Sequence, residues 1–269
     1  MQVALTIAGS DSGGGAGVQA DLKTFHRFGV FGTSAITAIT AQNTQGVDAW
    51  EPVSADLVAK QIRAVVTDLH PAATKTGMLG TSQIIECIAG EIRKSGLQNY
   101  VLDPVMVSTS GDLLIQQDAV RSISAELIPL ATVVTPNADE AAVLTGLSVR
   151  TLSEMRDAAK AIAALGAKAV LLKGGHVPQE GSVIDVLYDG EFTEYRHEYM
   201  DTTSTHGTGC TLSAAITAGL ALGRTLRDAV QSAIEFVHDA IATAPMLGSG
   251  HGPLNHFAGS PATNSRTIA

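Results

Sequence analysis

The sequence contains little cysteine and few aromatic residues. Its 269 residues include two cysteines, Cys87 and Cys210, and aromatic residues make up 4% of the chain. Two cysteines cannot form a framework of several disulfides, and no cysteine–histidine set has the spacing of a zinc site. We expect a core of small aliphatic side chains, and we expect Cys87, which lies in an apolar run, to belong to it.

The chain also lacks clusters of positive charge and long apolar segments. Lys and Arg total 17 against 26 Asp and Glu, which gives a net charge of −9, and no basic run occurs. Neither nucleic acid nor an anionic membrane is therefore expected as a partner. Because no run of about 18 apolar residues and no secretory pattern occur, we expect a cytoplasmic protein.

Apolar segments of strand length alternate with segments of helical periodicity. The predicted strands are residues 3–8, 32–40, 72–75, 100–103, 132–135 and 169–172. The predicted helices are residues 18–28, 54–69, 81–95, 116–128, 138–144, 153–165, 211–222 and 226–244. This alternation predicts a three-layer α/β fold, with helices on both faces of a mostly parallel sheet.

The second half of the chain adds one departure from this alternation. Residues 183–188 and 191–195 flank Asp189-Gly190 and predict an antiparallel hairpin at one edge of the sheet. No linker divides the chain, so residues 1–259 are expected to form a single domain. Residues 260–269 are polar and without periodicity, and we expect a disordered tail there.

Glycine and polar residues follow the predicted strands. In open α/β sheets, ligands bind beyond the carboxyl ends of the strands. We expect one site at that edge, surrounded by residues 9–17, 40–45, 76–78, 103–106, 136–137 and 173–176.

The segment His206-Gly207-Thr208-Gly209-Cys210 leads directly into a predicted apolar helix. Amides at a helix start attract phosphate or a developing anion. They also draw a thiol toward thiolate, so Cys210 is expected to accept a proton near neutral pH. An anion site beside a proton acceptor suits phosphoryl transfer to a hydroxyl. The alternative is a glycine-rich helix start with an inert, buried cysteine.

The glycine loop at residues 13–17 resembles a loose dinucleotide-binding pattern. That pattern needs an acidic residue after the next strand, where residues 39–42 offer none, so NAD or FAD binding is disfavoured. The P-loop motif requires a glycine directly before a lysine. No such pair occurs in the sequence, so a P-loop is excluded. A backbone wall around a small substrate and a tight turn that allows helix packing remain as interpretations.

Other polar residues at the predicted edge suit a phosphate and metal site. Asn137 and Glu140 share a helix face and could serve Mg²⁺, or form only a capping box. Lys173 can reach phosphate oxygens, or simply be solvated. Asp21 and Asp103 could tune a proton acceptor, hold metal-bound water, or serve as surface or cap residues. Histidines without ligand spacing are interpreted as ordinary: His70, His197, His238, His251 and His256.

Taken together, these segments resemble the hydroxymethylpyrimidine/phosphomethylpyrimidine kinases of thiamine biosynthesis, in the ribokinase-like superfamily. The motifs that carry the resemblance are residues 9–21, 41–44, 75–79, 103–106, 135–140, 173–176 and 206–210. The resemblance runs from about Val3 to Phe257 and implies one ribokinase-like kinase domain. It also implies ATP and Mg²⁺ as cofactors, hydroxymethylpyrimidine and then its monophosphate as substrates, and a homodimer.

The resemblance also implies roles for particular residues. It implies that Cys210 is the base, beside an anion hole formed by the amides from Gly207 to Cys210, and that Asp21 lies near the catalytic centre. The other implied roles are substrate contacts from Gly9, Gln42, Met78 and Val105, ATP contacts from Asn137, Lys173, Thr208 and Gly209, and metal contacts from Asp103 and Glu140. Gln42 would bond the aminopyrimidine edge, and Met78 would pack on its ring.

Two other functions stay open at this point. Vitamin B6 has a similar hydroxymethyl heteroaromatic core, so a pyridoxal or pyridoxine kinase, or a dual activity, is the alternative within the superfamily. A non-catalytic pyrimidine-binding protein is the alternative from another class. The presence of Lys173, Asn137, Glu140 and Cys210 argues against loss of turnover.

Overall fold

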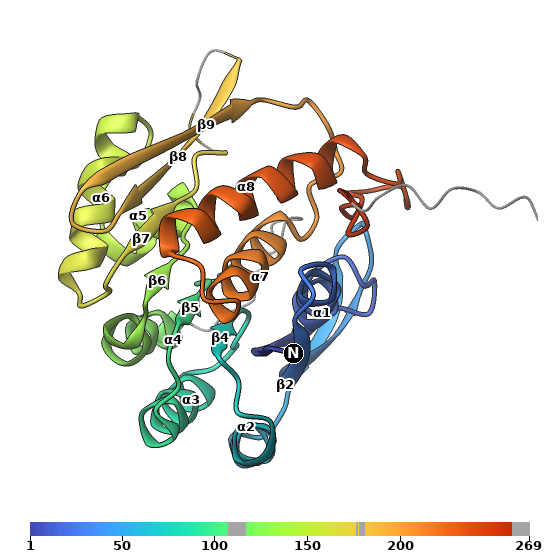
Figure 1. Cartoon of the computed structure of the whole chain (residues 1–269), viewed down its shortest axis with the longest axis vertical. Coiled ribbons are helices and arrows are strands. Elements are labelled where there is room, and N and C mark those ends of the chain that lie inside the picture. Colours follow the sequence, from blue (N-terminus) through green and yellow to red (C-terminus); the bar gives the residue numbers. More distant parts are fainter. Residues whose placement is uncertain (107–116, 176, 178–180, 260–269) are drawn as a thin grey trace, which may run out of the picture.

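A computed structural model describes residues 1–106, 117–175, 177 and 181–259. Its strands are β1 (Val3–Ser10), β2 (Phe31–Gln42), β3 (Val47–Pro52), β4 (Ala73–Thr76), β5 (Tyr100–Leu102), β6 (Val133–Val134), β7 (Val170–Leu172), β8 (Ser182–Tyr188) and β9 (Phe192–Glu198). Within the described ranges they form one sheet in the order β3-β2-β1-β4-β5-β6-β7-β8-β9 (Figure 1). In this order, the neighbouring strands from β2 to β7 pair in parallel. At one edge β3 pairs antiparallel with β2, and at the other β8 pairs antiparallel with both β7 and β9.

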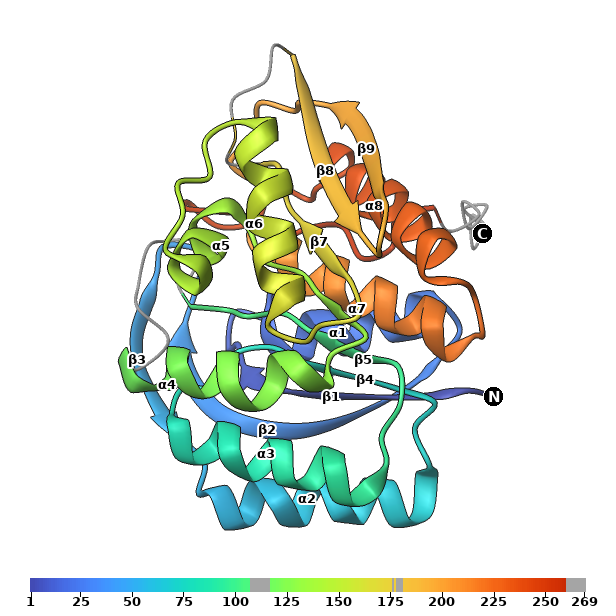
Figure 2. The same cartoon turned by 90° about the vertical axis from the view of Figure 1, so that its left-hand side faces the viewer.

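Helices cover both faces of the sheet, as predicted. One face carries α1 (Gly17–Arg27), α7 (Thr208–Ala221) and α8 (Leu226–Ala242). The other carries α2 (Ala55–Leu69), α3 (Ser82–Ser95), α4 (Gln117–Ser122), α5 (Ala138–Thr145) and α6 (Leu152–Ala164) (Figure 2). A π-helical turn, Ile123–Leu127, and a 3₁₀ turn, Ile128–Leu130, continue α4. Each face has its own cluster of mainly aliphatic side chains.

The antiparallel strand β3 was missed in the sequence, where only the hairpin β8–β9 was expected. Most of its side chains are exposed, and Val47 and Trp50 are half-buried. Because an edge strand that packs little on a core needs no apolar run, the pattern gave no signal. The expectation for Cys87 is also wrong: its side chain is half-buried, and its thiol donates to the Ala55 carbonyl oxygen at 3.2 Å.

Other expectations fall partly outside the described residues. The predicted helix 116–128 starts one residue before the described part of α4, and the expected tail at 260–269 lies wholly outside. The single domain stays a prediction. None of the helices in the described ranges is both long and apolar enough to cross a membrane.

The parallel strands bring the predicted site segments to one edge. Ile7 of β1 pairs with Thr76 of β4, and Thr76 pairs with Leu102 of β5. Gly9 near the end of β1, Gly77 after β4 and Asp103 after β5 are therefore neighbours in space. Tyr100 is buried, and its hydroxyl lies 2.7 Å from the Thr76 hydroxyl, which links β5 to β4 just below this edge.

We expect Tyr100→Phe to lower the free energy of unfolding by about 1–2 kcal/mol, because it leaves the buried Thr76 hydroxyl without this partner. Urea unfolding measures the change. Tyr199→Phe is the control: Tyr199 is exposed, so its loss should cost less than about 0.5 kcal/mol. Equal effects of the two substitutions would contradict a contribution from the Tyr100–Thr76 hydrogen bond.

Candidate active site

A cavity of about 660 Å³ lies at the carboxyl edge of the parallel strands. Of the site residues predicted from the sequence, twelve line it: Gly9, Gln42, Met78, Asp103, Val105, Asn137, Glu140, Lys173, Gly207, Thr208, Gly209 and Cys210. They come from segments that are far apart in the chain. The prediction that these segments meet at one site is therefore confirmed, whereas their individual roles stay predictions.

Asp21 is the exception among the predicted residues. Its side chain has no exposed surface and does not line the cavity. Asp21 lies on the inner face of α1, where it forms an ion pair with Lys75. A direct contact with a substrate is therefore excluded, because the carboxylate lies behind the cavity wall. His176, which belongs to a predicted edge segment, lies outside the described residues.

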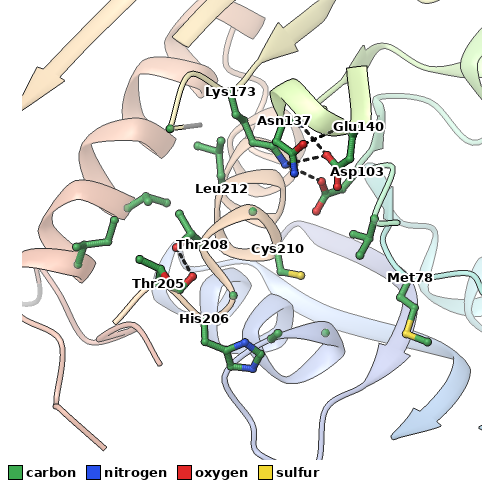
Figure 3. A pocket seen from close by; sticks show the side chains of 18 of the residues that line it. Met78, Asp103, Asn137, Glu140, Lys173, Thr205, His206, Thr208, Cys210 and Leu212 are labelled. Carbon is green, nitrogen blue, oxygen red and sulfur yellow. Dashed lines mark hydrogen bonds and ion pairs between the residues drawn. The ribbon is translucent and has the colours of Figure 1, made fainter. Parts of the chain in front are cut away.

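Lys173 lies between two buried carboxylates. Its Nζ atom is 3.2 Å from Asp103 Oδ1 and 3.7 Å from Glu140 Oε2 (Figure 3). Burial would lower the pKa of Lys173, but the negative charges of Asp103 and Glu140 raise it well above its ordinary value. Lys173 is thus charged at every physiological pH, and its position after β7 lets the ammonium face the cavity. A fixed cation of this kind suits the oxygens of a phosphate chain.

Asn137 and Glu140 form the capping box that the sequence left open. Asn137 Oδ1 accepts a hydrogen bond from the Glu140 amide at 2.8 Å, and Glu140 Oε2 accepts one from the Asn137 amide at 2.7 Å. Both side chains also line the cavity, so the cap does not remove them from the site. Burial raises the pKa of Glu140 to about 7, which makes a further cation nearby favourable.

The donor set fits a Mg²⁺ ion that is completed by substrate. Asp103 and Glu140 offer carboxylate oxygens at the cavity wall. In the described part of the chain, no group of three or more His, Cys, Asp or Glu side chains could hold a metal by itself. Mg²⁺ commonly uses one or two carboxylates and takes its other ligands from water and phosphate, which agrees with this incomplete set.

The start of α7 forms the part of the cavity wall next to the glycine loop. Gly207 has a φ of +81°, and a Cβ atom there would overlap the Gly15 carbonyl oxygen. The Thr208 amide donates to the Thr205 carbonyl oxygen at 3.2 Å. Among the described residues, no acceptor is found for the amides of Gly209 and Cys210. Those two amides at a helix start suit an anion.

The Cys210 side chain extends from the first turn of α7 beside this amide pair (Figure 3). Burial raises the pKa of its thiol to about 12. The positive charge of Lys75 and the Gly17 amide lower it, but they do not offset burial and the carboxylates Asp21 and Asp103. The expectation that Cys210 is close to thiolate at neutral pH is therefore wrong for the unliganded chain, because burial outweighs the helix-start amides.

Asp11 holds the glycine loop against the start of α7, a role that was not predicted from the sequence. Its carboxylate accepts hydrogen bonds from the backbone amides of Gly13, Gly15 and Ala16, with distances of 2.7–2.9 Å. Its Oδ2 atom also lies 2.9 Å from His206 Nε2. Burial raises the pKa of Asp11, but the His206 and amide hydrogen bonds lower it below its ordinary value. An aspartate two residues before a glycine run is a turn signal that could have been recognised.

Two histidines that were interpreted as ordinary also line the cavity. His197 of β9 and His238 of α8 have ring centroids 5.9 Å apart, and Asp185 of β8 lines the cavity with them. Sequence spacing gave no signal, because these residues come together only when the β8–β9 hairpin faces α8.

The site thus joins a fixed cation, free helix-start amides and a thiol in one cavity at the edge of an α/β sheet. These are the parts of an enzyme that transfers phosphoryl groups to a small molecule. Residues 11–255 match the family model described as phosphomethylpyrimidine kinase. The chain belongs to this family, and it is accordingly a phosphotransferase.

Curated relatives agree with this assignment. A hydroxymethylpyrimidine/phosphomethylpyrimidine kinase of Rhizobium meliloti is 51% identical over 95% of this chain and 97% of its own length. The protein of the same name from Bacillus subtilis is 46% identical over 95% of this chain and 94% of its own length. A thiamine biosynthesis bifunctional protein of Geobacter sulfurreducens is 46% identical over 94% of this chain and 52% of its own length.

Solved structures confirm the ribokinase-like fold. An ADP complex of Bacillus subtilis pyridoxal kinase has a TM-score of 0.89 and 42% identity, over 96% of this chain and 98% of that one. Staphylococcus aureus pyridoxal kinase in complex with pyridoxal has a TM-score of 0.90 and 38% sequence identity. The match covers 97% of this chain and 96% of that one. A Clostridium difficile phosphomethylpyrimidine kinase has a TM-score of 0.80 and 43% sequence identity. The match covers 90% of this chain and 100% of that one.

We expect Gly207→Ala to destabilise the protein by about 2–6 kcal/mol, because the new Cβ atom adds overlap with Gly15 to backbone strain. Gly223→Ala is the matched control: its φ is +80°, and an added Cβ would have no neighbour within 4 Å. In the control, the free energy of unfolding should fall by about 1 kcal/mol, from backbone strain alone. Chemical unfolding of both variants measures the difference, and similar losses would contradict the close approach of the two loops.

Proposed function

We propose that this chain phosphorylates 4-amino-5-hydroxymethyl-2-methylpyrimidine with ATP, and then phosphorylates the monophosphate to the pyrophosphate, in thiamine biosynthesis. One observation carries the proposal: Lys173, the α7 amides and Cys210 line the same cavity as Gln42 and Met78. The names of the curated relatives support this choice of substrate, and the solved ADP complex of a relative supports the use of a nucleotide.

In this proposal the substrate ring lies between the glycine loop and Met78. A Cβ atom on Gly9 would lie 3.0 Å from Met78 Sδ, so glycine at this position lets Met78 pack against the β1 backbone while its side chain lines the cavity. Gln42 hydrogen-bonds the amino edge of the pyrimidine, and Val105 contacts its apolar side. These contacts direct the hydroxymethyl group toward Cys210.

The nucleotide phosphates lie against Lys173, Asn137, Thr208 and Gly209. Asp103 and Glu140 would hold Mg²⁺, which neutralises phosphate charge when it is bound. The alcohol oxygen bonds to the γ-phosphorus, the bond to ADP breaks, and the alcohol proton passes to the Cys210 thiolate. The amides of Gly209 and Cys210 stabilise charge on the transferred group.

The two phosphorylations differ in their need for a base. In the first, the nucleophile is a neutral alcohol that must lose a proton. In the second, it is a phosphate oxygen that is already ionised. Cys210 is therefore more important in the first step, and its high pKa makes the first step faster as the pH rises.

A pyridoxal kinase activity is the second candidate, alone or beside the first. The solved pyridoxal kinases of Bacillus subtilis and Staphylococcus aureus favour it, because their folds superpose on this chain. A cytoplasmic homodimer also belongs to the proposal. Half-exposed apolar side chains of β2, Phe31 and Ile39, support a partner surface, and sedimentation of the purified chain would test the dimer.

An assay with ATP and either alcohol, with mono- and diphosphorylated products resolved, tests the substrate. We expect kcat/KM for hydroxymethylpyrimidine to exceed that for pyridoxal by at least tenfold, since Gln42 and Met78 suit the aminopyrimidine. A preference for pyridoxal would replace the main proposal with the second candidate. ATP consumption that depends on the pyrimidine would exclude a binding protein without turnover.

We expect Cys210→Ala to slow the first phosphorylation by about 10²-fold or more, with a smaller loss in the second. In the wild type, the first step should accelerate up to tenfold per pH unit near neutrality, because the thiolate fraction rises below the thiol pKa. Single-turnover rates of both steps between pH 6 and pH 9 measure this. Cys87→Ser is the cysteine control, and equal losses in both steps would refute the role of Cys210 as base.

A further inference from the structure

A segment that follows α8 contacts three loops of the site from outside the cavity. Residues 246–253, called the strap below, lie beyond the end of α8, in red in Figure 1, and none of these described residues lines the cavity. The strap contacts the loop after β2, the glycine loop after β1 and the segment that leads into α7. Each of these loops contains or adjoins residues that line the cavity.

One end of the strap lies against Thr44 in the loop after β2. The Thr44 carbonyl oxygen accepts a hydrogen bond from the His251 amide at 2.7 Å, and Thr44 Oγ1 accepts one from the Gly250 amide at 3.3 Å. Gln45 Nε2 donates to Ser249 Oγ at 2.6 Å. A Cβ atom on Gly250 would overlap the Thr44 carbonyl oxygen, so glycine is needed for this approach.

The other end of the strap holds the segment that leads into α7. The His206 amide donates to the Gly252 carbonyl oxygen at 3.1 Å, and His206 pairs with Pro253 in a short parallel bridge. Pro253 also lies against the glycine loop, because a Cβ atom on Gly15 would come within 3.1 Å of Pro253 Cβ. The strap therefore spans from the loop after β2 to the start of α7.

The strap holds a backbone conformation that costs free energy. Met246 has a φ of +54°, in the left-handed region that residues other than glycine avoid, and the buried Ser204 hydroxyl donates to its sulfur atom at 3.7 Å. Gly248 has a φ of +82°, and a Cβ atom there would overlap Thr44 Oγ1. Because Met246 and Leu247 are mostly exposed, burial of apolar surface does not account for this shape. Strained backbone of this kind gathers at functional sites, where surrounding contacts fix it.

The two loops that the strap joins hold different reactants in the proposed reaction. Gln42, two residues before Thr44, contacts the pyrimidine, and its backbone amide and carbonyl oxygen form hydrogen bonds with Ser12 Oγ at 2.8 and 2.7 Å. The Gly209 amide, three residues after His206, contacts the transferred phosphoryl group. A misplacement of about 1 Å between reacting atoms can lower the rate about 10²-fold. The distance between these two loops therefore matters to the transfer.

We propose that the strap aligns the alcohol with the phosphoryl group by fixing the loop after β2 relative to the start of α7. Thr44 and Gly250 are then positioning residues, since neither lines the cavity. This inference rests on the proposed function. Among the described residues, no hydrogen bond joins the strap to Lys173, Asp103 or Glu140, which hold the nucleotide and metal side of the site. Loosening the strap should therefore affect the alcohol more than ATP.

Steady-state kinetics of Gly250→Ala test the alignment, with the alcohol that the wild type prefers. We expect kcat/KM for the alcohol to fall about tenfold or more and KM for the alcohol to rise, because Gln42 loses its fixed position, while KM for ATP changes less than about threefold. Gly90→Ala in α3 is the matched control: neither glycine has a positive φ, and a Cβ atom on Gly90 meets nothing within 4 Å. A variant that merely folds less well would lower kcat and leave both KM values unchanged, and that result overturns the proposal.

Two milder variants decide the case if Gly250→Ala does not fold. Thr44→Val keeps the shape of the side chain but removes the oxygen that accepts a hydrogen bond from the Gly250 amide, whereas Thr44→Ser keeps that oxygen. We expect Thr44→Val to raise KM for the alcohol about threefold or more and Thr44→Ser to retain the wild-type value. Equal KM values for the alcohol in these two variants would contradict the proposal.

Hydrogen exchange of the free chain, followed by mass spectrometry, tests the connection without any reaction. In Gly250→Ala, or in Thr44→Val, we expect exchange to become about tenfold faster both in residues 41–46 and in residues 202–209, because the His206 amide is bonded to the strap. Gly90→Ala should exchange as the wild type does in both segments. Faster exchange in residues 41–46 alone overturns the proposal, since the strap then holds one loop and does not join two.

The two kinds of measurement separate this inference from the proposed function. If the wild type phosphorylates neither alcohol, the proposed function fails and this inference fails with it, even where exchange shows that the strap joins the loops. If the wild type phosphorylates the pyrimidine but neither segment responds to the variants, the proposed function stands and this inference alone fails.

Discussion

The hydrogen bond between Asp11 and His206 joins two segments that lie 195 residues apart in the chain, and the rest of the site depends on it. A carboxylate can only accept, so His206 Nε2 carries the hydrogen and donates to Asp11 Oδ2 over 2.9 Å. The same carboxylate accepts hydrogen bonds from three amides of the glycine loop, so one side chain fixes both the loop and the start of α7. Gly15 and Gly207 then approach too closely for any side chain. Without this contact, the glycine loop and the helix start would not face the same cavity.

Charge in the site is arranged in compensated groups at two depths. At the cavity wall, Lys173 lies between Asp103 and Glu140 and leaves an excess of negative charge for a metal ion to offset. Behind the wall, Lys75 pairs with Asp21, where neither water nor substrate reaches. Lys75 lowers the pKa of the Cys210 thiol, whereas Asp21 and Asp103 raise it. The half-buried thiol rests protonated at neutral pH, and the balance of the neighbouring charges decides how readily it gives up its proton.

Much of the fold and most of the site followed from the sequence. The alternation of apolar strands with amphipathic helices predicted the layers, and the polar residues after strands predicted the edge where Asp103, Lys173 and the glycine loop meet. Strand β3 escaped because it packs little on a core and so carries no apolar pattern. His197 and His238 escaped because local spacing cannot reveal residues that meet across a hairpin and a helix. The motifs were informative because short stretches such as 206–210 carry their chemistry locally.

The sequence by itself determined the strand–helix order, the small-residue start of α7 and the identity of the reactive groups, since these depend on neighbours along the chain. Only the tertiary structure decided the state of those groups. Local sequence placed Cys210 at a helix start and suggested an acidic thiol, but burial raised its pKa to about 12. Asp21 was recognised as a candidate, yet packing turned it away from the cavity toward Lys75. Desolvation and pairing are sums over all surrounding atoms, and segments distant in sequence supply most of those atoms.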